Sequence, residues 1–325
     1  MTSHQAIGGS VDPRAAAARA PDLAGSLRSL RRGASGAFLV TVAGTGLGFL
    51  SNMVIARLTG RAEYGIYALM ISWVSLLAVV AQAGQDISIV RFMPSYINGG
   101  FWGEVRGLRR GVGLLVFATS VCVAAIGCMI VHELGARHDA AWRDTFYIGF
   151  ATLPILTQLQ QSGALHRAFK RPVVTNLYST VLRPLAVIPL MLLLARVVVH
   201  PDAPMASAAS ALAVLLALAA SALHMSCAWP AHARNITPRY ELRRWAVIGS
   251  QLSLLSIIVA GGNWLSVLIL GALMGTGEVG PYYAALRMAT FALFAQQSVN
   301  VVLAPMIAER HDAGDMAGLQ IVAAR

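Results

Sequence analysis

Apolar residues occur along most of this chain in continuous runs rather than in alternation with polar residues. As a helix, a run of about 20 residues is long enough to cross a bilayer core of about 30 Å, whereas membrane barrel strands would alternate. The pattern therefore predicts an all-α integral membrane protein with about eight transmembrane helices. The eight runs cover residues 34–55, 66–85, 111–131, 145–165, 175–199, 205–228, 246–273 and 283–307.

The composition supports the same class. Apolar and aromatic residues make up 57% of the 325 residues and charged residues only 12%, about half the charged share of an ordinary soluble domain. This excludes a soluble enzyme, a disordered chain and a disulfide-rich secreted domain. Cys122, Cys128 and Cys227 all lie in apolar runs, so we interpret them as packing residues rather than as metal ligands or disulfide partners.

The distribution of arginine and lysine predicts how the helices are oriented. If the N-terminus is cytoplasmic, 18 of the 25 basic residues lie in inside segments, five lie in outside segments and two lie within spans. This bias favours cytoplasmic N- and C-termini and an even number of spans. Residues 1–33 are polar and rich in Ala and Arg, and we expect them to form a disordered cytoplasmic tail.

A short sequence repeat follows the first and the seventh predicted spans. A duplicated set of helices would explain it, with both halves starting on the same side of the membrane; two unrelated Gly-rich outer turns would also explain it. On the first interpretation, residues 34–228 form a six-helix lobe and residues 229–325 form the first two helices of an incomplete second lobe. The repeat pairs Leu58, Gly60, Glu63, Gly65 and Tyr67 with Leu273, Gly275, Glu278, Gly280 and Tyr282, 215 residues later.

The chain contains no motif for nucleotide binding, metal hydrolysis or nucleophilic catalysis. We therefore expect no enzyme activity, no catalytic residue, no cofactor and no metal site. Gly44 and Gly48 have the spacing that permits close helix contact. None of the 14 acidic residues lies at the centre of a predicted span, which disfavours a coupled exporter that carries its ion on a buried carboxylate.

Two arginines fall inside predicted spans, where a charged side chain costs about 2.5–3.5 kcal/mol on insertion scales and usually faces a cavity or a partner. Arg287 lies about one turn inside the outer end of the eighth span, and Arg183 precedes Pro184 in the fifth. Both are candidate residues for binding an anionic substrate such as a sugar phosphate. Alternatively, each side chain extends to the interface, or Arg183 marks a helix start after a proline break.

Several predicted spans also carry amide side chains. Gln158 and Gln161 are three residues apart, and Gln296 and Asn300 are four apart, so each pair shares a helix face. They either line an aqueous cavity or bond neighbouring helices to each other. Single amides in other spans belong to the same group, and His166 and His224 are expected to be packing residues. These single amides are Asn52, Gln82 and Asn263.

The segment from Arg57 to Ala68 resembles the first outer loop of bacterial Wzx-type polysaccharide flippases, which belong to the MATE-like superfamily. Gly84 and the run Arg91-Phe-Met-Pro94 resemble the end of their second helix. The run Glu278-Val-Gly-Pro-Tyr282 with Arg287, followed by Ala304-Pro305 and Gly314-Asp315, resembles the opening of their second lobe. The resemblance covers roughly residues 34–325.

This resemblance implies two six-helix lobes that rock around a central cationic cavity. They would move a lipid-pyrophosphate-linked oligosaccharide across the bacterial inner membrane without ATP. The implied partners are that lipid-linked substrate, the bilayer and polysaccharide assembly proteins, with no nucleic acid. The family usually has 12 to 14 helices, so the resemblance also implies a truncated second lobe. The alternatives are a cation-coupled drug or metabolite antiporter of the same superfamily, and a non-transporting scaffold or remnant.

Overall fold

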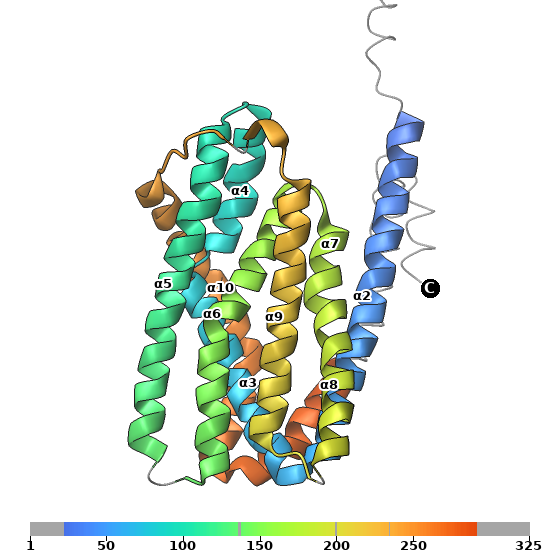
Figure 1. The fold of residues 1–325 in the computed structure, drawn as a ribbon, viewed down its shortest axis with the longest axis vertical. Helices are drawn as coiled ribbons and strands as arrows, with labels where there is room; N and C mark the ends of the chain where they lie inside the picture. The colour runs from blue at the N-terminus through green and yellow to red at the C-terminus, as the bar shows by residue number, and fades with distance from the viewer. Residues whose placement is uncertain (1–22, 136–137, 199, 234, 291–325) are drawn as a thin grey trace, which may run out of the picture.

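The computed structural model describes residues 23–290 apart from 136–137, 199 and 234, and within this part every regular element is helical. The long helices lie side by side, with α5 on one side of the bundle, α2 on the other, and α6 and α9 between them (Figure 1). The elements are α2 Leu23–Thr59, α3 Arg61–Gln82, α4 Gln85–Asn98, α5 Trp102–Leu134, α6 Ala140–Ala168, α7 Pro172–Asn176, a π-helical segment η2 Leu177–Leu182, α8 Arg183–Val197, α9 Ala203–Ala228, a short turn η3 Ala231–Ala233, α10 Leu242–Met274 and a helix over 276–290.

Six helical segments of the described part are long and apolar enough to cross a membrane, which confirms the predicted all-α membrane class. They lie in α2, α3, α5, the run from α7 through η2 into α8, α9 and α10. Helix α6 coincides with the fourth predicted span and has 29 residues, but its amides make it too polar to join this group. The helix over 276–290 covers the start of the eighth predicted span, and residues 291–307 lie outside the described residues.

Three predicted boundaries need correction. Helix α2 begins at Leu23, so residues 23–33 are helical rather than part of a disordered tail. The second span does not run through residue 85, because Ala83 and Gly84 adopt left-handed conformations and a separate helix, α4, begins at Gln85. Helix α5 begins at Trp102, well before the predicted residue 111, because the Arg-rich segment continues the same helix.

Small residues allow the central helices to approach each other closely. Helix α9 presents a buried stripe of alanines, and its main contact is with α6. A side chain at Gly127 of α5 would meet the Phe150 ring of α6 at 2.9 Å, and Gly149 of α6 lies against Met70 of α3. Lipid tails are as apolar as these surfaces, so close packing rather than hydrophobic burial stabilises such contacts.

The sequence repeat has the same backbone conformation in both copies. Gly60 has φ 80° and ψ 175°, and Gly275 has φ 79° and ψ 176°. This region is essentially restricted to glycine. Each glycine ends one helix and starts the next, at the junctions of α2 with α3 and of α10 with the helix over 276–290. The geometry agrees with a duplicated helix–turn–helix unit.

We expect Gly60→Ala and Gly275→Ala each to destabilise the protein by about 1–3 kcal/mol, because alanine disfavours this conformation. The measurement is the midpoint of thermal unfolding in one detergent. Gly46→Ala is the control, because Gly46 lies inside α2 with nothing within 4 Å of its Cβ position, and alanine favours a helix over glycine. Equal midpoints for all three variants would contradict the assigned role of the backbone.

Candidate functional site

A cavity of about 260 Å³ lies between α2, α3, the run from η2 into α8, α9 and the helix over 276–290. Both arginines that the sequence singled out, Arg183 and Arg287, line it. They belong to helices far apart in the sequence, so only the packing of the bundle brings them to one place. Their side chains are half-buried, with part of each exposed to the cavity.

Arg183 reaches the cavity through an irregular helix. The chain stays helical from α7 through the six π-helical residues of η2 into α8, so Arg183 does not follow a helix break. Pro184 lacks an N–H, and in a regular helix its ring would clash with the carbonyl of Thr180. The wider π turn relieves this crowding. Such turns are frequent at functional sites, and both Thr180 and Arg183 line the cavity.

Arg287 is held by aromatic side chains. Its guanidinium donates a hydrogen bond to the Tyr283 hydroxyl one turn earlier. It also lies 4.7 Å from the centre of the Tyr283 ring and 5.3 Å from that of Trp264 on α10. Its Nε atom is buried and has no hydrogen-bond partner. The arginine is therefore oriented by cation–π contacts and keeps donor capacity for a ligand.

Neutral polar groups complete the wall of the cavity. The hydroxyls of Tyr67 on α3 and Ser210 on α9 lie 2.9 Å apart and share a hydrogen bond. Asn52, one of the amides noted in the sequence, also lines the cavity, and its Nδ2 donates to the Gly48 carbonyl at 2.8 Å. A side chain at Gly44 would meet Thr180 at 2.7 Å, so α2 approaches η2 closely there, whereas Gly48, the other glycine of the predicted pair, has nothing within 4 Å of its Cβ position.

The cavity is electropositive. None of its described lining residues is acidic, and among the described residues no carboxylate forms an ion pair with Arg183 or Arg287. Two cations surrounded by hydroxyl and amide groups favour an anion. No cluster of three or more metal-ligating side chains occurs within the described residues.

The other predicted site residues do not join this cavity in the described part. Gln158 of α6 donates from Nε2 to the Gly113 carbonyl of α5 at 2.9 Å, so it bonds two helices, and it also lines a second cavity elsewhere in the bundle. Gln161 is buried in the bundle, and both of its amide atoms lack a partner. The Asn263 side chain, Gln296 and Asn300 lie outside the described residues. His166 and His224 are packing residues, bonded to Ser221 and Tyr178 respectively.

Sequence reasoning missed the aromatic and hydroxyl part of the site. Tyr283 directly follows the repeated Tyr282, and Tyr67 is itself a repeat position, but neither residue type is rare enough to indicate a site. Ser210 belongs to a run of alanines and serines that predicts only close packing. The repeat was therefore the available signal for these tyrosines, and tertiary contacts were needed to find Ser210.

At one end of the cavity the two repeat copies touch each other. Gly65 lies against the Thr276 backbone, and a side chain at Gly280 would meet the Arg61 carbonyl at 2.5 Å. The Arg61 guanidinium donates to Glu278 at 2.7 Å and to the Gly277 carbonyl at 3.0 Å. Beneath this contact, the rings of Tyr64 and Tyr283 lie 5.9 Å apart. We call this contact between the repeated turns the repeat contact; Gly65 and Gly280 lie two and three residues before the cavity residues Tyr67 and Tyr283.

The fold and the cavity define a multi-pass, all-α membrane protein with a cationic internal site. Comparison with known families adds that the sequence profile described as "Polysaccharide biosynthesis protein" matches residues 30–311. The chain therefore belongs to this family.

Comparisons with individual proteins are less informative. No curated protein matches the sequence significantly. Three solved chains do match. One of them, named only "protein A", has a TM-score of 0.52 and 12% sequence identity over 87% of this chain. This likeness shows a similar fold. The chain spans 65% of the length of that structure.

We expect Gly65→Ala to open the repeat contact, because its new methyl group would overlap the Thr276 backbone. The measurement is the distance between spin labels at Arg61→Cys and Glu278→Cys, in a background with the three native cysteines changed to serine. The exposed Arg61–Glu278 ion pair that these labels replace contributes little stability. The distance distribution should shift to longer values with Gly65→Ala and stay unchanged with Gly46→Ala. An unchanged distribution in both variants would show that the contact tolerates the methyl group.

Proposed function

We propose that this protein translocates a lipid-pyrophosphate-linked oligosaccharide for cell-surface polysaccharide biosynthesis. The observation that carries this proposal is the meeting of Arg183 and Arg287 in one cavity whose described lining has no acidic residue. A diphosphate offers several charged oxygens, and guanidinium groups bind such oxygens through paired, charge-assisted hydrogen bonds. The matching family of polysaccharide biosynthesis proteins supports the same substrate class.

The proposed mechanism is alternating access around this cavity. In this proposal the repeat contact, where backbones approach at Gly65 and Gly280, acts as the gate at one end of the cavity. Separating the two copies would break the Arg61–Glu278 ion pair and part the buried rings of Tyr64 and Tyr283. Arg287 lies on the helix over 276–290 and Arg183 on α8, so separation of the two repeat copies would change how the arginines share an anion. Binding of the diphosphate by both arginines would then favour the closed arrangement.

A Wzx-type flippase of the bacterial inner membrane, with both termini in the cytoplasm, is the form of this proposal that agrees with the arginine distribution. A cation-coupled antiporter of the same superfamily is less well supported. It would need a carboxylate to carry the ion, and the described cavity lining offers two cations instead.

The test replaces the cavity arginines in the gene that encodes this chain and follows surface polysaccharide. We expect Arg287→Gln and Arg183→Gln each to reduce surface polysaccharide about tenfold or more, since each loses a charge-assisted hydrogen bond to the substrate. Lipid-linked oligosaccharide should accumulate in the cells at the same time. Protein levels are measured in the same membranes, because loss of Arg287 also removes its contacts with Tyr283 and Trp264.

Two further variants sharpen this test. Arg57→Gln is the matched control, since Arg57 is exposed and lies outside the cavity lining. Arg287→Lys keeps the charge but loses the planar guanidinium group, which can donate two hydrogen bonds side by side. Surface polysaccharide in this variant should therefore fall between the levels of the wild type and of Arg287→Gln. Normal surface polysaccharide in Arg287→Gln and Arg183→Gln, at normal protein levels, would overturn the proposed role of the cavity.

A further inference from the structure

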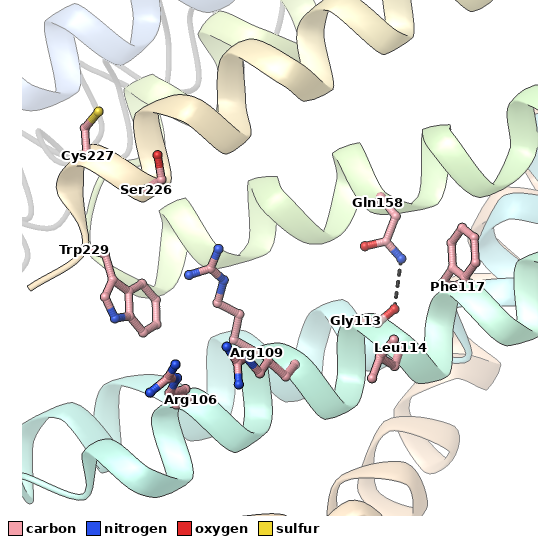
Figure 2. Close-up of a pocket in the computed structure, with 10 residues that line it drawn as sticks. Arg106, Arg109, Gly113, Leu114, Phe117, Gln158, Ser226, Cys227 and Trp229 are labelled. Atoms are coloured by element: carbon pink, nitrogen blue, oxygen red, sulfur yellow. Dashed lines mark hydrogen bonds between the residues drawn. The ribbon is translucent and has the colours of Figure 1, made fainter. Parts of the chain in front are cut away.

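A second, larger cavity lies on the other side of the bundle from α2 and α8, where α5 packs beside α6 (Figure 1). It is an open groove of about 1000 Å³, formed by the first half of α5, the middle of α6 and the end of α9. Figure 2 shows its two ends. Arg106, Arg109 and Trp229 lie at one end, and Leu114, Phe117 and Gln158 lie at the other. We call it the arginine groove.

One stripe of α5 forms the floor of the arginine groove. The stripe begins with three arginines and continues, toward the middle of the helix, with Leu114 and Phe117, both exposed. The spacing of three and four residues keeps all of these positions on one helix face. The surface is therefore cationic at the end of the bundle and apolar farther along. The stripe consists of Arg106, Arg109, Arg110, Gly113, Leu114 and Phe117.

The positive charge of this groove is not neutralised by the described part of the protein. No acidic residue lines it. The nearest carboxylate on the same helix, Glu104, pairs with Arg239 at 3.5 Å. The Arg109 guanidinium lies 4.6 Å from the centre of the Trp229 ring, a contact that orients it without cancelling its charge. Like charges at these spacings repel each other, so an anion bound among the three arginines would relieve repulsion.

The groove is also rigidly built. The segment after α9 crosses the start of α5, where the Arg239 N–H donates to the Gly103 carbonyl at 2.9 Å and Gly107 lies against the Arg239 backbone. The Arg106 guanidinium donates to the Ile236 carbonyl at 2.5 Å. Trp229 is 7% exposed, so the aromatic wall of the groove is fixed by packing. These contacts hold Arg106 and the Trp229 ring beside Arg109 in place before any ligand binds.

We propose that the arginine groove binds one anionic glycerophospholipid from the surrounding bilayer, with its phosphate among Arg106, Arg109 and Arg110 and an acyl chain along Leu114 and Phe117. The groove is charged at the end of the bundle and apolar toward its middle. A phospholipid in a leaflet has the same arrangement, with a charged headgroup at the membrane surface and apolar acyl chains in the bilayer core. Basic pockets between transmembrane helices bind lipid headgroups in this way.

The occupant is a resident lipid rather than the transported substrate. Helices α6 and α9 pack tightly against each other and stand between the groove and the cavity of Arg183 and Arg287. A lipid in the groove therefore has no direct path to that cavity through the described helices. The inference does not depend on the proposed function, since it requires only that the protein sits in a membrane.

The test measures lipid binding to the purified protein by native mass spectrometry. The protein in neutral detergent is titrated with phosphatidylglycerol and, separately, with phosphatidylcholine. We expect one phosphatidylglycerol to bind the wild type preferentially. We expect Arg109→Gln with Arg110→Gln to weaken this binding about tenfold or more, because two charged donors to the phosphate are lost. Arg106 is left unchanged, since its guanidinium also donates a hydrogen bond to the Ile236 carbonyl.

The control is Arg91→Gln with Arg243→Gln, which removes the same charge from two exposed positions outside the groove. It should leave the binding of phosphatidylglycerol unchanged. Equal weakening in the two double variants would overturn the proposal in favour of diffuse attraction to a basic surface. Equal binding of phosphatidylcholine by the wild type would also overturn it. So would displacement of phosphatidylglycerol by an equimolar polyprenyl diphosphate, because the groove would then prefer the substrate lipid.

Discussion

Close approach of helix backbones at small residues is the interaction on which the rest of this structure depends. In a bilayer, burying an apolar side chain against another helix gains little over burying it in lipid. The alanine stripe of α9, Gly127 of α5 and Gly149 of α6 let the helices come near enough for extensive contact instead. The same device operates at the repeat contact, where Gly65 and Gly280 bring backbones together. The positions of the polar groups follow from these contacts.

The two cationic sites keep arginine in an apolar bundle in the same way. Arg287 is covered by Tyr283 and Trp264, whose ring faces attract its charge. Arg109 lies over Trp229 in the same manner, at the border of the groove. In neither place does a carboxylate of the described residues complete the pairing. An aromatic neighbour orients the guanidinium and leaves its positive charge available, which a carboxylate would cancel.

Two irregular backbone segments interrupt the regular helices of this bundle. The π turn before Arg183 accommodates Pro184 and directs Thr180 and Arg183 to the same cavity. The left-handed pair Ala83–Gly84 separates α3 from α4, and Gly84 lies against the Gly249 backbone of α10. Both irregularities sit beside helices that belong to the later part of the chain or to the cavity wall.

The sequence by itself determined the all-α membrane class, because long apolar runs without charge have few other stable forms in water or lipid. It also identified the repeat, whose glycines proved to share one backbone conformation, and it selected Arg183 and Arg287 because buried charge is costly. The sequence predicted the ends of the helices less accurately than the helical class of the protein. The arginines at the start of α5 were assigned to a loop on charge alone, although a helix that leaves the apolar core can continue with its charges exposed.

Only the tertiary structure decided which polar residues meet. Gln158 and Arg183 were both candidate cavity residues, yet Gln158 bonds α6 to α5, while Arg183 lines the same cavity as Arg287. Helix periodicity gives the face on which a side chain lies but not the neighbour of that face. That neighbour is set by contacts between residues far apart in the sequence, at glycines and alanines that carry no chemistry of their own.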